Sequence, residues 1–192
     1  MADYRADGPV DDKEPAVFGV EKMANEYGVV YADQSAFPGP PAWEHDWQEP
    51  YPVFSDRVVL EREPGELADL PDFVRCPQIW HFACTERAVD VLRQVCGRDI
   101  NVFGHGVVGD VELSFVQVVG TASRIDREKS VVDSFPTYEL VQWPAFYDED
   151  LPGLGDRLFT LPGRQFTGVF AGSAVRAAIT GAGLTGLRFV RV

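Results

Sequence analysis

The sequence predicts an α+β protein, with a mostly antiparallel sheet, two similar strand-helix-strand units and few helices. The first observation is that a strand, a helix with a capping residue and a returning strand occur twice, and their apolar stripes are offset by 87 residues. The second is that apolar residues between these units alternate in short runs, which proline and glycine separate. Such alternation is typical of antiparallel strands. Since the unit occurs only twice, a tandem repeat array is not expected.

The first unit runs from residue 77 to residue 103 (PQIWHFACTERAVDVLRQVCGRDINVF). Its apolar start predicts a strand, and Thr85 is a suitable N-cap for the helix that follows. Gly97 is expected to end this helix in a left-handed turn, and INVF (Ile100 to Phe103) to return as a strand. The residues expected to face the core follow the spacing i, i+3, i+4 and i+7 of a helix: Ala88, Val91, Leu92 and Val95.

The second unit lies at the end of the chain. FTGVFAGS (residues 166 to 173) predicts a strand followed by Ser173 as the N-cap of a helix. Gly183 is the expected helix stop, and LTGLRFVRV (residues 184 to 192) is the expected returning strand. The core-facing stripe has the same spacing as in the first unit: Val175, Ala178, Ile179 and Ala182.

Between the units the pattern predicts further strands. DVELSFVQVVG alternates with Val111, Leu113 and Phe115 on one face, and Thr137 to Trp143 and Arg157 to Leu161 are similar. Gly104, Gly106 and Gly109 form a G-x-G-x-x-G pattern before the first of these strands. A dinucleotide-binding loop must open a helix, whereas this pattern precedes a strand, so we expect a glycine-rich hairpin.

Charge and proline divide the chain into two parts. Residues 1–72 hold 17 acidic and 5 basic residues and 9 of the 14 prolines, whereas the remainder is close to neutral. We expect residues 1–70 to form an acidic, proline-rich part that packs on the same domain as residues 71–192. Within it, Tyr27 to Ala32 predicts a strand, and Ser55 to Arg62 fits either a strand or a helix.

The net charge of −13 excludes several function classes. Nucleic acids and anionic membranes both require a basic footprint, so neither is an expected direct partner. The sequence has no run of 18 apolar residues and no apolar segment near its start, so neither a membrane span nor a signal peptide is expected. Three cysteines, an odd number, fit reduced thiols in a cytoplasmic protein.

Residues that could support catalysis or metal binding are few. His81 lies three residues from Cys84, but no second pair completes a zinc-binding pattern. The sequence contains no G-x-S-x-G, P-loop or H-E-x-x-H pattern. We therefore expect no metal, no cofactor and no enzyme activity. A Ser/His/Asp site using His45, His81 or His105, or a pair of carboxylates, stays open as an alternative.

Two segments mix aromatic side chains with carboxylates in a loop context, a combination typical of protein-binding hot spots. The alternative for the first is a loop whose tryptophans pack into the core, and for the second a solvated turn. The candidate interface residues of the first segment are Trp43, Glu44, Asp46, Trp47 and Glu49. The second segment runs from Trp143 to Asp150, and its candidate interface residues are Tyr147, Asp148, Glu149 and Asp150.

Four blocks of sequence carry a resemblance to a known family. They are LPDFVRC (70–76), ACTERAVDVLRQV (83–95), FVQVVGTASRIDREKS (115–130) and RLFTLPGRQFTGVFAGSAVRAAITGAGLTGLRF (157–189). From Pro71 to the C-terminus the chain resembles the Imm11 family (DUF1629) of bacterial immunity proteins. In the third block Ile125-Asp126 and Ser130 match, and the closing block is the most specific. The chain departs from the family at the first helix cap, Thr85 in place of serine, and near Gln117, where the family's asparagine is not evident.

The resemblance implies an Imm11-like α+β domain over residues 71–192 and a function in bacterial competition. Such proteins are encoded beside polymorphic toxins and protect the producing cell by binding the toxin domain, and several of these toxins are nucleases. Because nuclease domains are usually basic, an acidic inhibitor would be steered to its target at up to about 10⁸–10⁹ M⁻¹s⁻¹ at low salt. We therefore expect a non-catalytic toxin inhibitor. The alternatives are a binding module for another protein or a small ligand, and a hydrolase with a carboxylate site.

Overall fold

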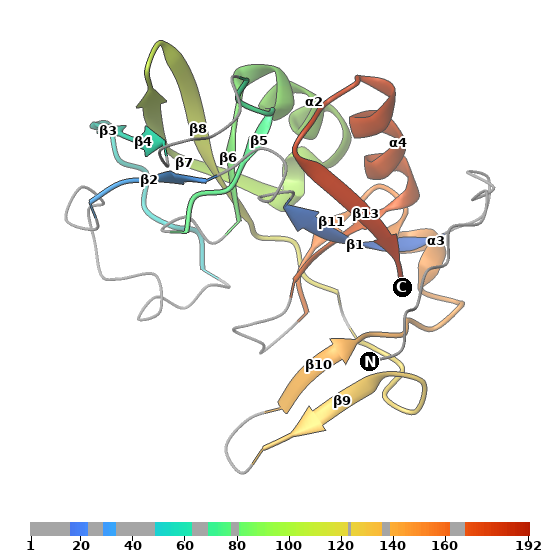
Figure 1. The fold of residues 1–192 in the computed structure, drawn as a ribbon. Coiled ribbons are helices and arrows are strands. Elements are labelled where there is room, and N and C mark those ends of the chain that lie inside the picture. Colours follow the sequence, from blue (N-terminus) through green and yellow to red (C-terminus); the bar gives the residue numbers. More distant parts are fainter. Residues whose placement is uncertain are drawn as a thin grey trace.

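The computed structural model describes residues 16–22, 29–33, 49–62, 69–77, 81–122, 124–135, 139–161 and 168–192. These residues form two larger sheets, two two-stranded sheets and three α-helices (Figure 1). Most strand pairs are antiparallel, so the predicted α+β class is confirmed. No helix within these residues is long and apolar enough to cross a membrane.

The larger sheet has five strands in the order β3-β7-β8-β6-β5. All its pairs are antiparallel except β3 with β7, which is parallel. The strands are β3 (Arg57–Val59), β5 (Phe73–Val74), β6 (Phe82–Cys84), β7 (Ile100–Val108) and β8 (Val111–Val118). A short separate sheet pairs β2 (Val30–Tyr31) with β4 (Glu61–Arg62). Residues 55–62, which fitted either a strand or a helix, therefore form the strands β3 and β4.

The second sheet has four antiparallel strands in the order β11-β12-β1-β13. They are β1 (Val17–Lys22), β11 (Leu158–Phe159), β12 (Val169–Gly172) and β13 (Leu187–Arg191). The middle position of β1 means that a strand from the acidic N-terminal part of the chain is hydrogen-bonded on both sides to strands of the C-terminal part.

The two predicted strand-helix-strand units are β6-α2-β7 and β12-α4-β13, with α2 (Glu86–Cys96) and α4 (Ser173–Gly181) as their helices. In each unit both strands pair antiparallel with one strand inserted between them, which is β8 in the first unit and β1 in the second. The two helices pack against each other between the units (Figure 1). The units thus share one topology, and the second depends on a strand from far away in the sequence.

The N-terminal cap of α2 is confirmed, but the predicted end of this helix is wrong. The Thr85 side chain accepts a hydrogen bond from the Ala88 amide at 3.4 Å. Gly97 has a φ of −55°, and a 3₁₀ turn, η2 (Gly97–Asp99), continues the chain in right-handed geometry. This turn directs the Asp99 carboxylate to the amide of Leu158 at 3.1 Å, so a tertiary contact outweighs the local preference of glycine for a left-handed end.

In the second unit the predicted N-cap is wrong and the predicted stop is confirmed. Gly172, not Ser173, is the N-cap of α4, and Ser173 is the first helical residue. A Cβ atom at Gly172 would lie only 2.0 Å from the carbonyl oxygen of Leu154, so close backbone packing requires glycine there. Gly183 has a φ of +63°, and its amide donates to the carbonyl of Thr180 at 3.0 Å. Because the helix ends at Gly181, Ala182 is exposed rather than part of the buried stripe.

The G-x-G-x-x-G pattern forms the predicted hairpin. Val108 pairs with Val111, so Gly109 and Asp110 make a two-residue turn, and Gly109 has a φ of +56°. On β8, Leu113 and Phe115 are buried as expected, but Val111 is 38% exposed because it lies beside this turn.

The main core lies between the two helices and the two larger sheets. It is built from both units and includes Leu92 and Ile179, which are 1% and 3% exposed. The opposite face of the five-stranded sheet carries a second cluster around Phe103 and Phe115. Of the predicted stripe on α2, Ala88 and Leu92 are buried, whereas Val91 and Val95 are partly buried at its border.

We predict that Leu92→Ala lowers the free energy of unfolding by about 2–5 kcal/mol, because it leaves a cavity in the main core. Gln94→Ala on the exposed side of the same helix is the matched control and should change stability by less than about 0.5 kcal/mol. Urea unfolding followed by circular dichroism measures both. Equal stability of the two variants would contradict the assigned core face of α2.

Candidate protein-interaction surface

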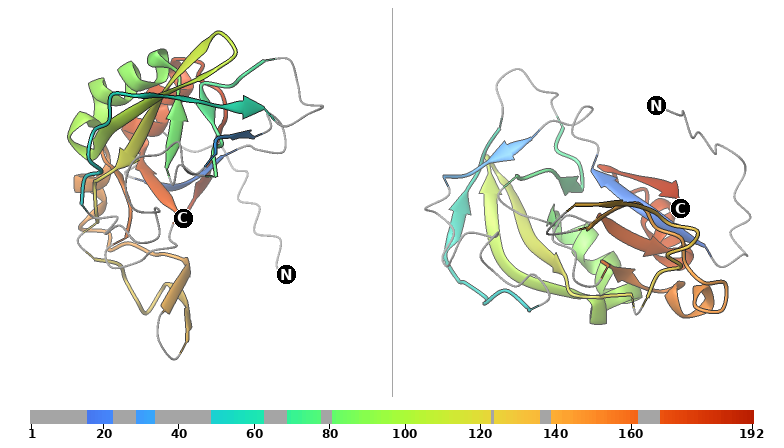
Figure 2. Two further views of the ribbon diagram at one scale, coloured as in Figure 1. Left: turned by 90° about the vertical axis from the view of Figure 1, so that its left-hand side faces the viewer. Right: turned by 90° about the horizontal axis from the view of Figure 1, so that it is seen from below.

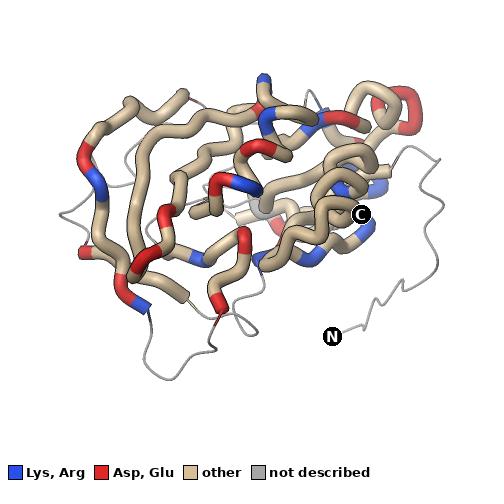
Figure 3. The backbone as a smooth tube through the Cα atoms, turned by 90° about the horizontal axis from the view of Figure 1, so that it is seen from above, with Lys and Arg blue, Asp and Glu red and all other residues tan. Residues whose placement is uncertain are grey.

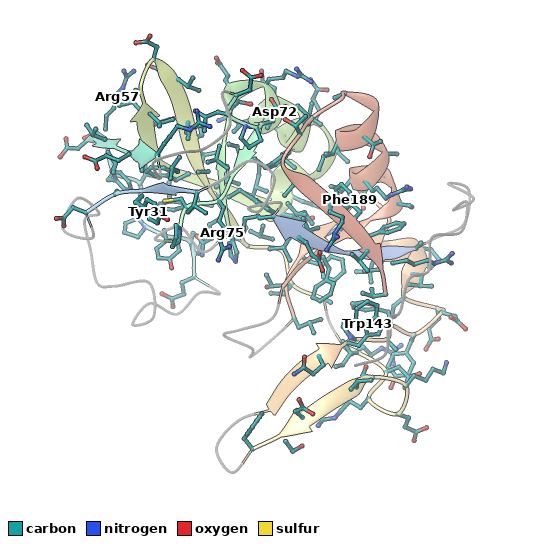
Figure 4. The ribbon with its side chains drawn as sticks, viewed as in Figure 1. Tyr31, Arg57, Asp72, Arg75, Trp143 and Phe189 are labelled. Carbon is teal, nitrogen blue, oxygen red and sulfur yellow. The ribbon has the colours of Figure 1, made fainter. Side chains whose placement is uncertain are left out.

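A hairpin projects from the body of the molecule, away from the two larger sheets (Figures 1 and 2). Its strands are β9 (Val131–Ser134) and β10 (Glu139–Trp143), which pair antiparallel with a register shift before Trp143. We call residues 126–135 and 139–145 the arm. Half of the exposed large apolar side chains that the structure describes lie on it: Val131, Phe135 and Trp143, at 56%, 43% and 38% exposure. Figure 4 shows Trp143 at the end of β10 nearest the body.

The base of the arm is held by a compact polar network. The Asp126 amide donates to the Ala145 carbonyl at 2.8 Å, and the Ala145 amide donates to the Ser130 hydroxyl at 2.9 Å. That hydroxyl donates in turn to the Asp126 carbonyl at 2.6 Å. The buried Asp126 carboxylate accepts from the amides of Glu128 and Lys129 at 3.1 and 3.3 Å. Since an isolated two-stranded hairpin is only marginally stable in water, this network determines how the arm is held.

The candidate residues 147–150 form a turn that follows the arm, which we call the acidic turn. The Asp150 amide donates to the Tyr147 carbonyl at 2.9 Å and closes the turn. Asp148 and Glu149 are exposed, whereas Tyr147 and Asp150 are partly buried. After Asp150 comes the short helix α3 (Leu151–Leu154), whose Leu154 packs with Phe146 into a third apolar cluster. The turn is therefore anchored on both sides, and the Asp148 and Glu149 side chains are exposed to solvent.

Arg124 lies against the acidic turn. Its guanidinium donates to Asp150 at 2.8 and 3.3 Å and to Glu149 at 2.9 Å. Its central carbon lies 4.4 Å from the centroid of the Tyr147 ring. The hydrogen bond to Asp150 raises the pKa of Arg124 above its ordinary value, so this group keeps its charge. Asp148 makes no ion pair with any residue that the structure describes, and its charge is free to meet a partner.

The other candidate segment is described only at its end. Trp43, Glu44, Asp46 and Trp47 lie outside the described residues. Glu49 is exposed, and its carbonyl accepts from the side chain of Gln117 on β8 at 2.8 Å. The same Gln117 side chain accepts from the Tyr51 amide at 2.7 Å, and the Tyr51 ring lies 5.0 Å from the ring of Phe103. Glu49 is thus held on the five-stranded sheet, not on the arm.

Acidic and basic positions are mixed over the described part of the molecule, and basic positions gather near the C-terminus (Figure 3). Residues 157–192 contain five arginines and no acidic residue. Residues 124–150, which include the arm and the acidic turn, contain seven acidic and three basic residues. The structure therefore associates the exposed aromatic side chains with an excess of negative charge.

Sequence patterns indicated the acidic turn but missed three side chains of this surface. Val131 and Phe135 were missed because the apolar pattern predicts strands but does not show that a hairpin projects away from the sheets and exposes its side chains. Arg124 was missed because its partners are 25 and 26 residues away in the sequence, beyond the reach of any local pattern. The one available signal was its place in the block FVQVVGTASRIDREKS, two residues before Asp126.

The histidine and cysteine side chains near the core have structural roles. Burial, with a smaller effect of the Lys22 charge, lowers the pKa of His81 to about 4, so its ring is neutral and accepts the Val118 amide at 2.7 Å. The Lys22 ammonium donates to the His81 carbonyl at 2.7 Å, and burial lowers the pKa of Lys22 to about 8. Burial raises the pKa of Cys84 and Cys96, which makes both thiols poor nucleophiles.

A serine and a histidine meet at an exposed position on the five-stranded sheet. Ser114 Oγ lies 3.3 Å from His105 Nδ1, where β8 pairs with β7. A catalytic triad also requires an acid that orients the histidine. Within the described residues no carboxylate contacts His105, and the neighbouring Glu112 pairs with Arg57 at 2.7 Å instead. Among the same residues, no three His, Cys, Asp or Glu side chains are grouped to hold a metal ion.

Comparison of the sequence with models of protein families and with curated proteins gives no match. The function is therefore inferred from the residues themselves and from the resemblance that the sequence motifs carry.

We predict a specific pH dependence of stability from His81. Its pKa is lower in the folded state than its unfolded value of 6.5, so its contribution is complete above about pH 6.5 and is lost as the pH falls through about 4. His81→Asn offers an uncharged acceptor to the Val118 amide and should flatten the stability curve between pH 6.5 and pH 4. Urea midpoints at several pH values measure this, and parallel curves for the two proteins would contradict the assignment.

Proposed function

We propose that this protein is an immunity protein that binds and neutralises a cognate toxin domain by non-catalytic protein–protein binding in the cytoplasm of the producing cell. One observation carries the proposal: Val131, Phe135 and Trp143 are exposed on a projecting arm next to the carboxylates of the acidic turn. Scattered exposed apolar residues are normal, but three on one small arm favour a binding surface. Aromatic anchors with a polar rim are typical of interface hot spots.

The charge of the chain supports a basic partner. The net charge is −13, and a nuclease toxin carries a basic surface for nucleic acid. Opposite charge speeds the encounter and rejects partners of like charge. The resemblance of residues 71–192 to the Imm11 family supports the same conclusion, because members of that family inhibit toxins encoded beside them.

The order at the base of the arm supports inhibition by direct binding. The network of Asp126, Ser130 and Ala145 fixes the arm before any partner arrives. A binding surface that is already ordered loses less conformational entropy when a complex forms, and this raises affinity. A non-enzymatic inhibitor needs such affinity, because it has no turnover.

Two linked measurements test the proposal. The purified protein is the bait for the C-terminal domain of the protein encoded beside it, and both are expressed together to measure rescue of growth. We expect a stoichiometric complex and full rescue. If the toxin domain is active but neither binds nor loses toxicity, the proposal is wrong.

We further predict that Asp148→Lys slows association with this toxin domain on the order of tenfold at low salt, because it reverses a charge on the acidic turn that no described residue pairs. Asp110→Lys makes the same change of charge at the exposed turn between β7 and β8, on the opposite side of the body from the arm (Figure 1). This control should bind almost as fast as the unmodified protein. Equal rates for the two variants would remove the acidic turn from the interface.

A further inference from the structure

The acidic turn holds Arg124 through two carboxylates and one aromatic ring. Asp150 accepts from the Nε and Nη2 atoms of Arg124 in a fork, at 2.8 and 3.3 Å. Glu149 accepts from Nη2 at 2.9 Å, and the Tyr147 ring lies 4.4 Å below the guanidinium carbon. A paired carboxylate, a second carboxylate and an aromatic face together match the planar fork of arginine, whereas lysine presents only a point charge.

The turn that forms this arrangement is built without Arg124. Two backbone hydrogen bonds fix it, from the Asp150 amide to the Tyr147 carbonyl at 2.9 Å and from the Gly153 amide to the Asp150 carbonyl at 3.0 Å. Asp150 precedes α3 at the N-cap position, but its carboxylate makes no capping hydrogen bond. The carboxylate is therefore committed to the guanidinium rather than to the helix, and the backbone hydrogen bonds of the turn do not involve Arg124.

Arg124 is held at the surface by contacts that another guanidinium group can replace. The side chains of Arg124 and Glu149 are 51% and 64% exposed. Exposed ion pairs contribute little to stability and are screened by salt. One guanidinium can therefore exchange for another at this site without any change of its charge.

We propose that Tyr147, Glu149 and Asp150 form an arginine-binding site, that Arg124 fills it in the free protein, and that an arginine of the partner replaces Arg124 in the complex. The identity of the partner rests on the proposed function, whereas the site itself does not. A basic toxin domain carries many arginine side chains. The exchange also gives selectivity, because a partner with lysine at the same position cannot reproduce the forked contact with Asp150.

The test uses the isolated protein and a small probe, N-acetyl-L-arginine methylamide, with the lysine analogue as the chemical control. Two-dimensional NMR titration follows the amides of residues 147–151 and the ring of Tyr147. If Arg124 fills the site about nine-tenths of the time, it weakens the apparent affinity for the probe about tenfold. We therefore expect Arg124→Ala to bind the probe about tenfold more tightly than the unmodified protein, and the lysine analogue to bind this variant more weakly.

Two further variants make the result specific. In the Arg124→Ala background, Asp150→Asn should abolish saturable binding, whereas Asp148→Asn should leave it unchanged, because Asp148 does not contact Arg124. Arg124 is exposed, and an unchanged thermal unfolding curve confirms that Arg124→Ala is folded.

The proposal is overturned if Arg124→Ala shows no saturable shifts at residues 147–151, or if arginine and lysine probes bind it equally. Because no toxin is present in the titration, such a failure leaves the proposed immunity function untouched. Conversely, if the toxin capture experiment fails but the titration is positive, the proposed immunity function is contradicted and the arginine-binding site is supported.

Discussion

The fold depends on the insertion of β1 between β12 and β13. On one side Val17 to Val20 pair with Gly172 to Val169, and on the other Phe18 to Lys22 pair with Arg191 to Leu187. Phe18 is 1% exposed and lies beneath the guanidinium of Arg176, 6.5 Å from the ring of Phe189. Without β1, both neighbouring strands would have rows of unpaired amides and carbonyls, which is costly inside a sheet.

This insertion explains why the two halves of the chain, so different in charge, form one structure. The first unit contains its own middle strand, β8, which follows β7 directly through a two-residue turn. The second unit receives its middle strand from residues 17–22. Further contacts join the N-terminal part to the five-stranded sheet, where Phe54 packs against Phe103 and Phe115 and its amide donates to the Phe103 carbonyl at 3.0 Å.

A group of hydrogen bonds between the two larger sheets, which we call the joint, determines where the arm begins. The buried Asp99 carboxylate accepts from Arg157 at 2.8 and 2.9 Å and from the Leu158 amide at 3.1 Å. The Gly120 amide donates to the Asp99 carbonyl, and the Gly120 carbonyl accepts from the Thr160 amide. The chain leaves this joint towards Asp126 and the base of the arm. These few polar contacts between the sheets therefore fix the point from which the chain runs to the arm.

The sequence predicted what depends on local periodicity, and it missed what depends on distant partners. The stripe of Leu92 and the cap at Thr85 predicted α2, because spacing and capping are properties of neighbouring residues. β1 was not predicted, because the short run of Val17 to Lys22 becomes a strand only by pairing with residues more than 140 positions away. Gly97 and Ser173 failed for the same reason, since tertiary contacts overrode local preferences. The acidic turn was found from its composition, but its guanidinium partner was not.

Hydrogen–deuterium exchange of the complex tests whether the arm and the acidic turn contact the toxin domain. Exchange is measured by mass spectrometry on the free protein and on the complex, peptide by peptide. We expect slower exchange in peptides covering residues 126–135 and 139–150, with little change on the turn between β7 and β8. Protection confined to that turn or to the helices α2 and α4, with none on the arm, would contradict it.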